Sequence, residues 1–87
     1  MFKKRRGINL PYEKQGLIYF NCINYDDMPD DVQDKIVNLC NKVGKENSEV
    51  LFEVMTNKEK SIRELALEYY VSERQLYNYR KKFYESW

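Results

Sequence analysis

Histidine is absent from the 87-residue sequence, and cysteine occurs only twice, at Cys22 and Cys40, with no C-x-x-C pattern. These absences exclude zinc-finger ligand sets and catalysis by histidine. A secreted scaffold held by disulfides would carry more cysteines in so short a chain. We therefore expect both cysteines to be reduced and buried, as small apolar side chains of a cytoplasmic protein.

Glycine and long apolar runs are also scarce. The three glycines, Gly7, Gly16 and Gly44, do not have the spacing of a phosphate-binding loop. The basic N-terminus is not followed by an apolar run long enough for an export signal, and no run is long enough for a membrane span. A chain this short rarely encloses a catalytic cleft, so we expect no enzymatic activity and no cofactor.

The net charge is only +1, which argues against the strongly basic surface that is typical of nucleic-acid-binding proteins. The charges are unevenly distributed, however. The N-terminus is basic through Lys3, Lys4, Arg5 and Arg6. The last sixteen residues hold four basic groups against two acidic ones. A chain with basic ends can bind DNA through one face.

Negative charge is concentrated in the middle of the chain. The residues concerned are Asp26, Asp27, Asp30, Asp31 and Asp34. They lack the spacing and the glycine of a calcium loop, and two of them are explained by a helix start, so we expect no metal site. An acidic region of this kind can also bind a basic partner.

The run from Leu17 to Ile23 is apolar and rich in strand formers, and its periodicity fits either a buried helix or a strand. No second strand pattern is present to pair with it, and an isolated strand is not stable. We therefore predict a helix over residues 11–25, with Pro11 as its first residue.

Two more helices are predicted before the C-terminal stretch. Pro29 and the aspartates after it are typical of a helix start, and Gly44 is expected to end that helix in a left-handed cap. Asn47 or Ser48 is expected to cap the next helix. The apolar residues of the two helices are Val32, Ile36, Leu39, Cys40 and Val43, then Val50, Leu51, Val54 and Met55. A polar connection over residues 56–60 follows.

The C-terminal stretch, residues 61–87, carries two helix-start signatures. Ser61 is followed three residues later by Glu64, and Ser72 three residues later by Gln75. In a capping box the Ser hydroxyl accepts from the backbone N–H three residues on, and the longer side chain reaches back to the backbone N–H of the Ser. Two such boxes in tandem predict a short helix, a tight turn and a second helix.

The apolar spacing supports the same arrangement. The two inward faces are formed by Ile62, Leu65, Ala66 and Tyr69, then by Leu76, Tyr79, Phe83 and Trp87. Val71 lies in the turn, where an apolar side chain can fill the angle between crossed helices. The whole resembles the homeodomain-like and sigma-region-4-like helix-turn-helix modules of bacterial regulators, transposases and phage proteins.

The turn segment Y-Y-V-S-E-R-Q-L-Y is similar to the common Y-G-V-S-x-x-T-V-Y form of these modules, and Ala66 aligns with their small residue. Tyr70 stands where the usual turn glycine would be. A non-glycine residue at positive φ costs roughly 1 kcal/mol. A turn with a different shape from that of the family is therefore an alternative.

The resemblance implies that the second helix enters the major groove, with its N-terminal half facing the bases. Carried over position by position, the outward residues are Ser72, Glu73, Arg74, Tyr77, Asn78 and Lys81. Among them Arg74 suits guanine, Asn78 suits adenine and Glu73 suits cytosine. The plainer explanation of each is a solvated helix face.

Phosphate contacts are expected around the reading residues. The candidates are Arg80, Lys81 and Lys82, with Lys58 and Lys60 before the first helix. Residues 1–9 are expected to form a flexible basic arm that reaches the adjacent minor groove, as in homeodomains. Its reading residues would be Lys3, Lys4, Arg5 and Arg6. The alternative is a disordered, solubilising terminus.

We therefore predict an all-α single domain over residues 10–87, a small bundle of about five helices that ends in a helix-turn-helix at residues 61–87. The expected function is that of a small DNA-binding protein, either a transcriptional regulator or a DNA-packaging or replication accessory of a phage or mobile element. The expected partner is double-stranded DNA. Two alternatives stay open for Tyr84 and Trp87, a homodimer contact or packing into the core. For Trp87 we favour the core.

The alternative function is a protein-interaction module on the same frame. It would bind a host or phage protein through the acidic region or the aromatic surface. Glu73 at the head of the second helix and the near-zero net charge favour this alternative.

Overall fold

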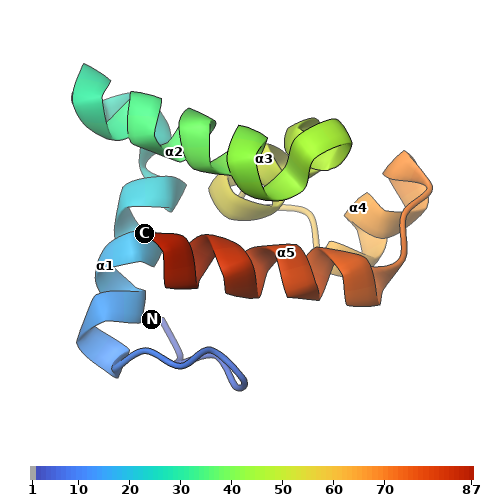
Figure 1. Ribbon diagram of the computed structural model, residues 1–87, viewed down its shortest axis with the longest axis horizontal. Coiled ribbons are helices and arrows are strands. Elements are labelled where there is room, and N and C mark those ends of the chain that lie inside the picture. The colour runs from blue at the N-terminus through green and yellow to red at the C-terminus, as the bar shows by residue number, and fades with distance from the viewer. Residues whose placement is uncertain (1) are drawn as a thin grey trace.

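Helices make up all the regular structure of residues 2–87, the part of the chain that this computed structural model describes (Figure 1). In chain order they are α1 (Tyr12–Ile23), η1 (Tyr25–Asp27), α2 (Asp30–Gly44), η2 (Lys45–Asn47), α3 (Ser48–Thr56), α4 (Ile62–Tyr69) and α5 (Glu73–Ser86), where η marks a 3-10 helix. The predicted all-α class is confirmed, and α1 decides between helix and strand for residues 11–25. The number of helical segments exceeds the expected five, because the 3-10 helices η1 and η2 lie in the connections on either side of α2.

The helix α5 lies through the middle of the domain. Figure 1 shows α2 along one side of α5, α1 at its C-terminal end and α4 at its N-terminal end. The radius of gyration of the Cα atoms is 12.1 Å, which matches the value of about 12 Å expected for one compact domain of this length. Within the described residues, no helix is both long and apolar enough to cross a bilayer.

Two hydrophobic clusters meet at α5. The larger joins α1, α2, α3 and α5, and its centre holds Ile18, Ile36, Leu51 and Phe83, all at 0% exposure. The smaller lies between α3, α4 and α5 and consists of Val50, Leu65, Ala66 and Leu76. The apolar faces predicted for the last four helices are therefore the faces that form the core.

The ends of α1 and α2 differ from the sequence prediction in detail. Pro11 is the N-cap residue of α1 and not its first helical residue, and Pro29 is the N-cap residue of α2, whose start the sequence predicted there. Gly44 has right-handed angles, with φ −83° and ψ −25°, so the predicted left-handed glycine cap is wrong. The positive φ falls on Lys45, at 52°, and Gly44 instead lies buried against Leu51.

The N-terminal segment packs against the helices, where the sequence predicted a free arm over residues 1–9. Ile8 is only 6% exposed and belongs to the larger cluster. The buried Gln15 holds the segment in place, because its amide donates to the carbonyls of Ile8 and Leu10 at 3.3 and 3.0 Å and its oxygen accepts from the Arg5 N–H at 2.9 Å. The first residue of the expected arm, Met1, lies outside the described residues.

Both cysteines are free and buried, as predicted. Burial raises the pKa of Cys22 and of Cys40 to about 12, and the neighbouring Cys40 adds to the effect at Cys22. Each thiol therefore stays protonated in the folded chain across the neutral range.

These thiols make stability fall at alkaline pH. Their pKa is raised on folding, so the unfolded chain loses the protons first, near pH 9, and the folded chain only near pH 12. The free energy of unfolding should be unaffected by the thiols below pH 9 and should decline as the pH rises from 9 towards 12. Urea unfolding on either side of pH 9 measures this decline. The Cys22→Ala, Cys40→Ala double variant is the control, and an equally steep decline in that variant would contradict the assignment.

Candidate nucleic-acid interface

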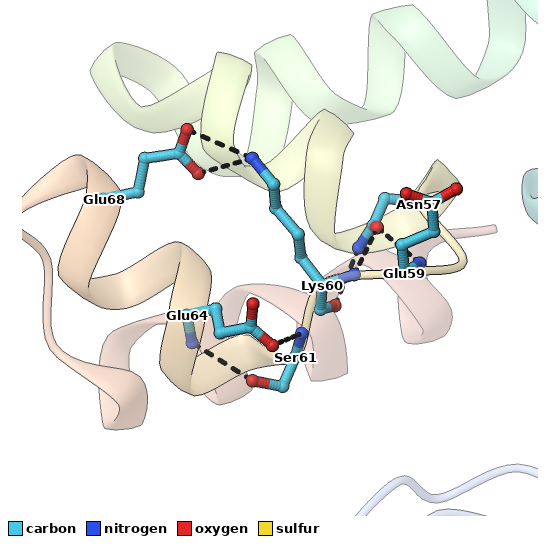
Figure 2. Close-up of polar contacts among 6 residues, drawn as sticks. All are labelled: Asn57, Glu59, Lys60, Ser61, Glu64 and Glu68. Atoms are coloured by element: carbon cyan, nitrogen blue, oxygen red, sulfur yellow. Dashed lines mark hydrogen bonds and ion pairs between the residues drawn. The ribbon is translucent and has the colours of Figure 1, made fainter.

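The start of α4 is held by a complete capping box, as predicted. The hydroxyl of Ser61 accepts from the backbone N–H of Glu64 at 3.1 Å, and a carboxylate oxygen of Glu64 accepts from the Ser61 N–H at 3.2 Å. Figure 2 shows both bonds at the point where the chain enters the helix. The direction in which α4 leaves the preceding loop is therefore set locally.

The loop before α4 is closed by Asn57. Its side-chain oxygen accepts from the backbone N–H groups of Glu59 and Lys60, both at 2.7 Å, and its amide donates to the Lys60 carbonyl at 2.8 Å (Figure 2). The Lys60 ammonium pairs with Glu68 at 2.8 Å, the only ion pair among residues 2–87. Hydrogen bonding and charge from Glu68 raise the pKa of Lys60, so this ammonium is committed within the domain and is a weaker candidate for a DNA phosphate.

The turn between α4 and α5 uses a left-handed tyrosine. Tyr70 has φ 57° and ψ 42°, the conformation that glycine usually supplies at the end of a helix. The backbone N–H of Val71 bonds to the Ala66 carbonyl at 3.0 Å, and the Val71 side chain packs on the smaller cluster. The turn therefore keeps the glycine-type shape despite the bulky residue, whose side chain is 95% exposed.

The start of α5 has only half of its predicted capping box. The hydroxyl of Ser72 accepts from the Gln75 N–H at 3.0 Å. The Gln75 amide does not reach back to Ser72 but donates to the Tyr79 hydroxyl at 2.9 Å, which also accepts from Asn47 at 2.9 Å. Asn47 therefore bonds to α5 and makes no cap bond to α3. These bonds fix the rotation of α5 about its own axis relative to η2.

The outward side of α5 carries the residues that the sequence proposed for base contact. Those exposed are Ser72, Glu73, Arg74, Tyr77, Asn78, Lys81 and Lys82. Four of them follow at helical spacing along one face, and we call this set the outer strip: Arg74, Tyr77, Asn78 and Lys81. Within residues 2–87 no hydrogen bond or ion pair engages the side chains of Arg74, Asn78 or Lys81. They are therefore free to contact a ligand.

Two of the predicted contact residues do not belong to the exposed outer strip. Arg80 is partly buried with its guanidinium over the Tyr77 ring, 5.0 Å from the centroid. Arg5 is also partly buried, and its Nε donates to the Tyr84 hydroxyl at 3.4 Å. Tyr84 itself is 1% exposed, so of the two alternatives left open for this residue the structure has core packing and not a dimer contact. Of the basic N-terminal residues, Lys3, Lys4 and Arg6 remain exposed.

The other candidate for the dimer contact, Trp87, is partly buried. Its ring packs near Phe83, with centroids 6.1 Å apart, and the Lys35 ammonium lies 4.3 Å from its centroid. This agrees with the packing into the core that the sequence favoured for Trp87.

A hollow of about 410 Å³ opens beside α5, between the N-terminal segment, α1, α3 and the loop before α4. We call it the basic hollow, because it is lined by Arg5, Lys58, Lys60 and Arg80 and by no acidic residue of the described chain. Sequence reasoning proposed each of these residues for phosphate or groove contact but did not group them, because Arg5 and Arg80 lie at opposite ends of the chain.

No protein-family model matches this chain, and no curated protein or solved structure is significantly similar to it. The similarity of residues 61–87 to helix-turn-helix modules therefore stays a prediction. What supports it is the local geometry of α4, the turn and α5.

Replacing Tyr70 by glycine should stabilise the protein. A left-handed conformation costs an L-residue roughly 1–2 kcal/mol, and glycine avoids this cost. Glycine also loses more backbone entropy on folding, which costs roughly 0.5–1 kcal/mol and offsets part of the gain. We expect Tyr70→Gly to raise the free energy of unfolding by up to about 1 kcal/mol, as measured by urea unfolding. Tyr70→Ala removes the same ring but keeps the Cβ, so it is the matched control and should show no such gain. A glycine variant less stable than the alanine variant would contradict the left-handed turn.

Proposed function

We propose that this chain is a small DNA-binding protein in which α4, the turn and α5 form a helix-turn-helix and α5 reads the major groove. The observation that carries the proposal is the outer strip. Arg74, Asn78 and Lys81 project from one face of a helix whose opposite face is anchored in both hydrophobic clusters, and none has a partner within the described residues. A rigid helix with an unpaired polar face is what base readout requires.

The chemistry of the strip suggests how the bases would be read. A guanidinium such as that of Arg74 can donate two hydrogen bonds to guanine, and the amide of Asn78 can pair with adenine. Glu73, at the exposed first turn of α5, can accept from cytosine. Lys81 and Lys82 extend the basic character towards the C-terminus, where they would meet phosphates.

A regulator or a DNA-packaging or replication accessory of a phage or mobile element is the role we propose, on the basis of the resemblance and the small size. Few phosphate contacts are available to one copy, so a single domain should bind modestly. Binding as a homodimer to two half-sites would offset this. Size-exclusion chromatography with and without duplex measures the number of copies.

Removing the charges of the outer strip should abolish duplex binding. A base contact of the Arg74 type contributes about 1–3 kcal/mol and Lys81 adds a phosphate contact. Gel shifts against a random duplex pool would identify the bound sequence, and fluorescence anisotropy would then compare the wild type with Arg74→Ala, Lys81→Ala. The control is Lys14→Ala, Lys42→Ala, which removes two exposed positive charges from α1 and α2. Full duplex affinity in the strip variant would show that α5 is not the reading helix.

Duplex binding should also weaken steeply with added salt. The logarithm of the binding constant falls with the logarithm of salt concentration by about 0.9 for each phosphate contact. We expect Lys82→Ala to reduce this slope by about 1 while leaving the preferred sequence unchanged, because the residue meets phosphate and not a base. A shift in the preferred sequence, with an unchanged slope, would contradict that role.

The acidic region favours a second candidate function. All five aspartates between residues 26 and 34 are exposed, and no ion pair engages them within the described chain. This face, centred on η1 and the start of α2, suits a basic surface on a host or phage protein. If the folded wild-type chain binds no duplex from the random pool, this protein-interaction role becomes the better proposal.

A further inference from the structure

The basic hollow holds two arginines without acidic partners. The Arg5 guanidinium carbon lies 5.6 to 5.9 Å from the ring centroids of Phe2, Tyr19 and Tyr84, and its Nε donates to the Tyr84 hydroxyl. The Arg80 guanidinium rests on Tyr77. Neither is paired with a carboxylate within residues 2–87, where Lys60 and Glu68 form the only ion pair.

This arrangement is costly for a chain without a ligand. Desolvation penalises a charge that has no acidic partner, and the penalty grows with burial. Here the two guanidiniums also act on each other. Burial, and then the positive charge of Arg5, lower the pKa of Arg80 to about 10. An anion placed between them would relieve both the desolvation and the repulsion.

We propose that the basic hollow is a binding site for a phosphoryl group, held between the guanidiniums of Arg5 and Arg80. Two forked guanidiniums match the several oxygens and the double charge of a phosphate better than they match one carboxylate. Lys58 adds a third positive group at the rim. The inference stands without the proposed function, because it needs no base contact from the outer strip.

The walls of the hollow indicate that the phosphoryl group belongs to an organic molecule. Besides the cations they include Tyr19, Ile23, Met55 and Ile62, so apolar and aromatic surface lies next to the charged pair. Two sources have this chemistry, a free nucleotide and the backbone of a nucleic acid. A nucleic acid bound along the outer strip would pass next to the hollow, because the Tyr77 ring of that strip packs against the guanidinium of Arg80, which lines the hollow.

The test is an NMR titration of the full chain with inorganic phosphate, at constant ionic strength set by chloride, followed on the arginine Nε–H signals. We expect saturable shifts at Arg5 and Arg80 and none at Arg63, which is exposed on α4 and does not line the hollow. Phosphate well above its Kd should also raise the Tm by several degrees, because it binds only the folded state.

Three variants make the test specific. Arg80→Met keeps an apolar stem and should lose the phosphate-induced Tm rise, while its Tm without phosphate should not fall, because an unpaired cation has been removed. Arg5→Lys retains the charge and loses the fork, so its phosphate affinity should drop at least tenfold. Arg63→Met removes one arginine elsewhere and should behave as the wild type. Equal weakening in Arg63→Met and Arg80→Met, or small shifts spread over all basic residues, would overturn the site.

Repeating the titration with adenosine monophosphate and with a short duplex identifies the source. If the duplex competes with inorganic phosphate for the Arg5 and Arg80 signals, the backbone occupies the hollow. If the monophosphate binds more tightly than inorganic phosphate and the duplex leaves these signals unchanged, the ligand is a free nucleotide. Both outcomes support the site. The Arg74→Ala, Lys81→Ala variant should bind phosphate normally, so failure of the DNA-binding proposal would be seen separately from failure of this one.

Discussion

Burial of α5 in two separate cores sets how the other helices pack around it. Phe83 and Tyr84 belong to the larger cluster, and Leu76 belongs to the smaller one, each at 0 or 1% exposure. One helix therefore connects α1 and α2 to α4, and a rotation of α5 would expose apolar surface in both clusters, at a cost of about 1.5–3 kcal/mol for each large side chain. The outward direction of Arg74, Asn78 and Lys81 is a consequence of this packing.

Polar contacts further restrict how the helices of the two hydrophobic clusters are arranged. The Tyr79 hydroxyl accepts from both Gln75 and Asn47, so the inner side of α5 is tied to the link before α3. Gln15 binds the N-terminal segment in a similar way through three backbone groups. Satisfied polar groups of this kind select one arrangement among several that would bury the same apolar area. In this small domain such contacts accompany the placement of Arg5 and Arg80 on the walls of one hollow.

The charges are arranged unequally around this frame. The acidic side chains at η1 and the start of α2 face solvent, while positive charge gathers on the outer strip and in the basic hollow, on neighbouring sides of α5. The net charge is therefore near zero because a negative surface and a positive surface offset each other. The two proposals concern adjacent parts of the positive surface, and Tyr77, under the guanidinium of Arg80, is the residue that joins them.

Features that depend only on neighbours within a few residues follow from the sequence alone. The capping box at Ser61 and the apolar spacing of α2, α3, α4 and α5 could be read directly, because they follow from helix geometry. The identity of the residues on the outward face of α5 followed from the same periodicity.

Features that join distant segments depend on how the whole chain packs. Arg5 meets Tyr84, the Asn47 amide bonds to the Tyr79 hydroxyl instead of capping α3, and Gly44 packs on Leu51 of α3 while the positive φ falls on Lys45. In each case a local preference competes with a packing contact or with a partner far along the chain, and the sequence does not reveal that partner. The basic hollow is the clearest example, because its two arginines are brought together by the docking of the N-terminal segment and have no common signal in the sequence.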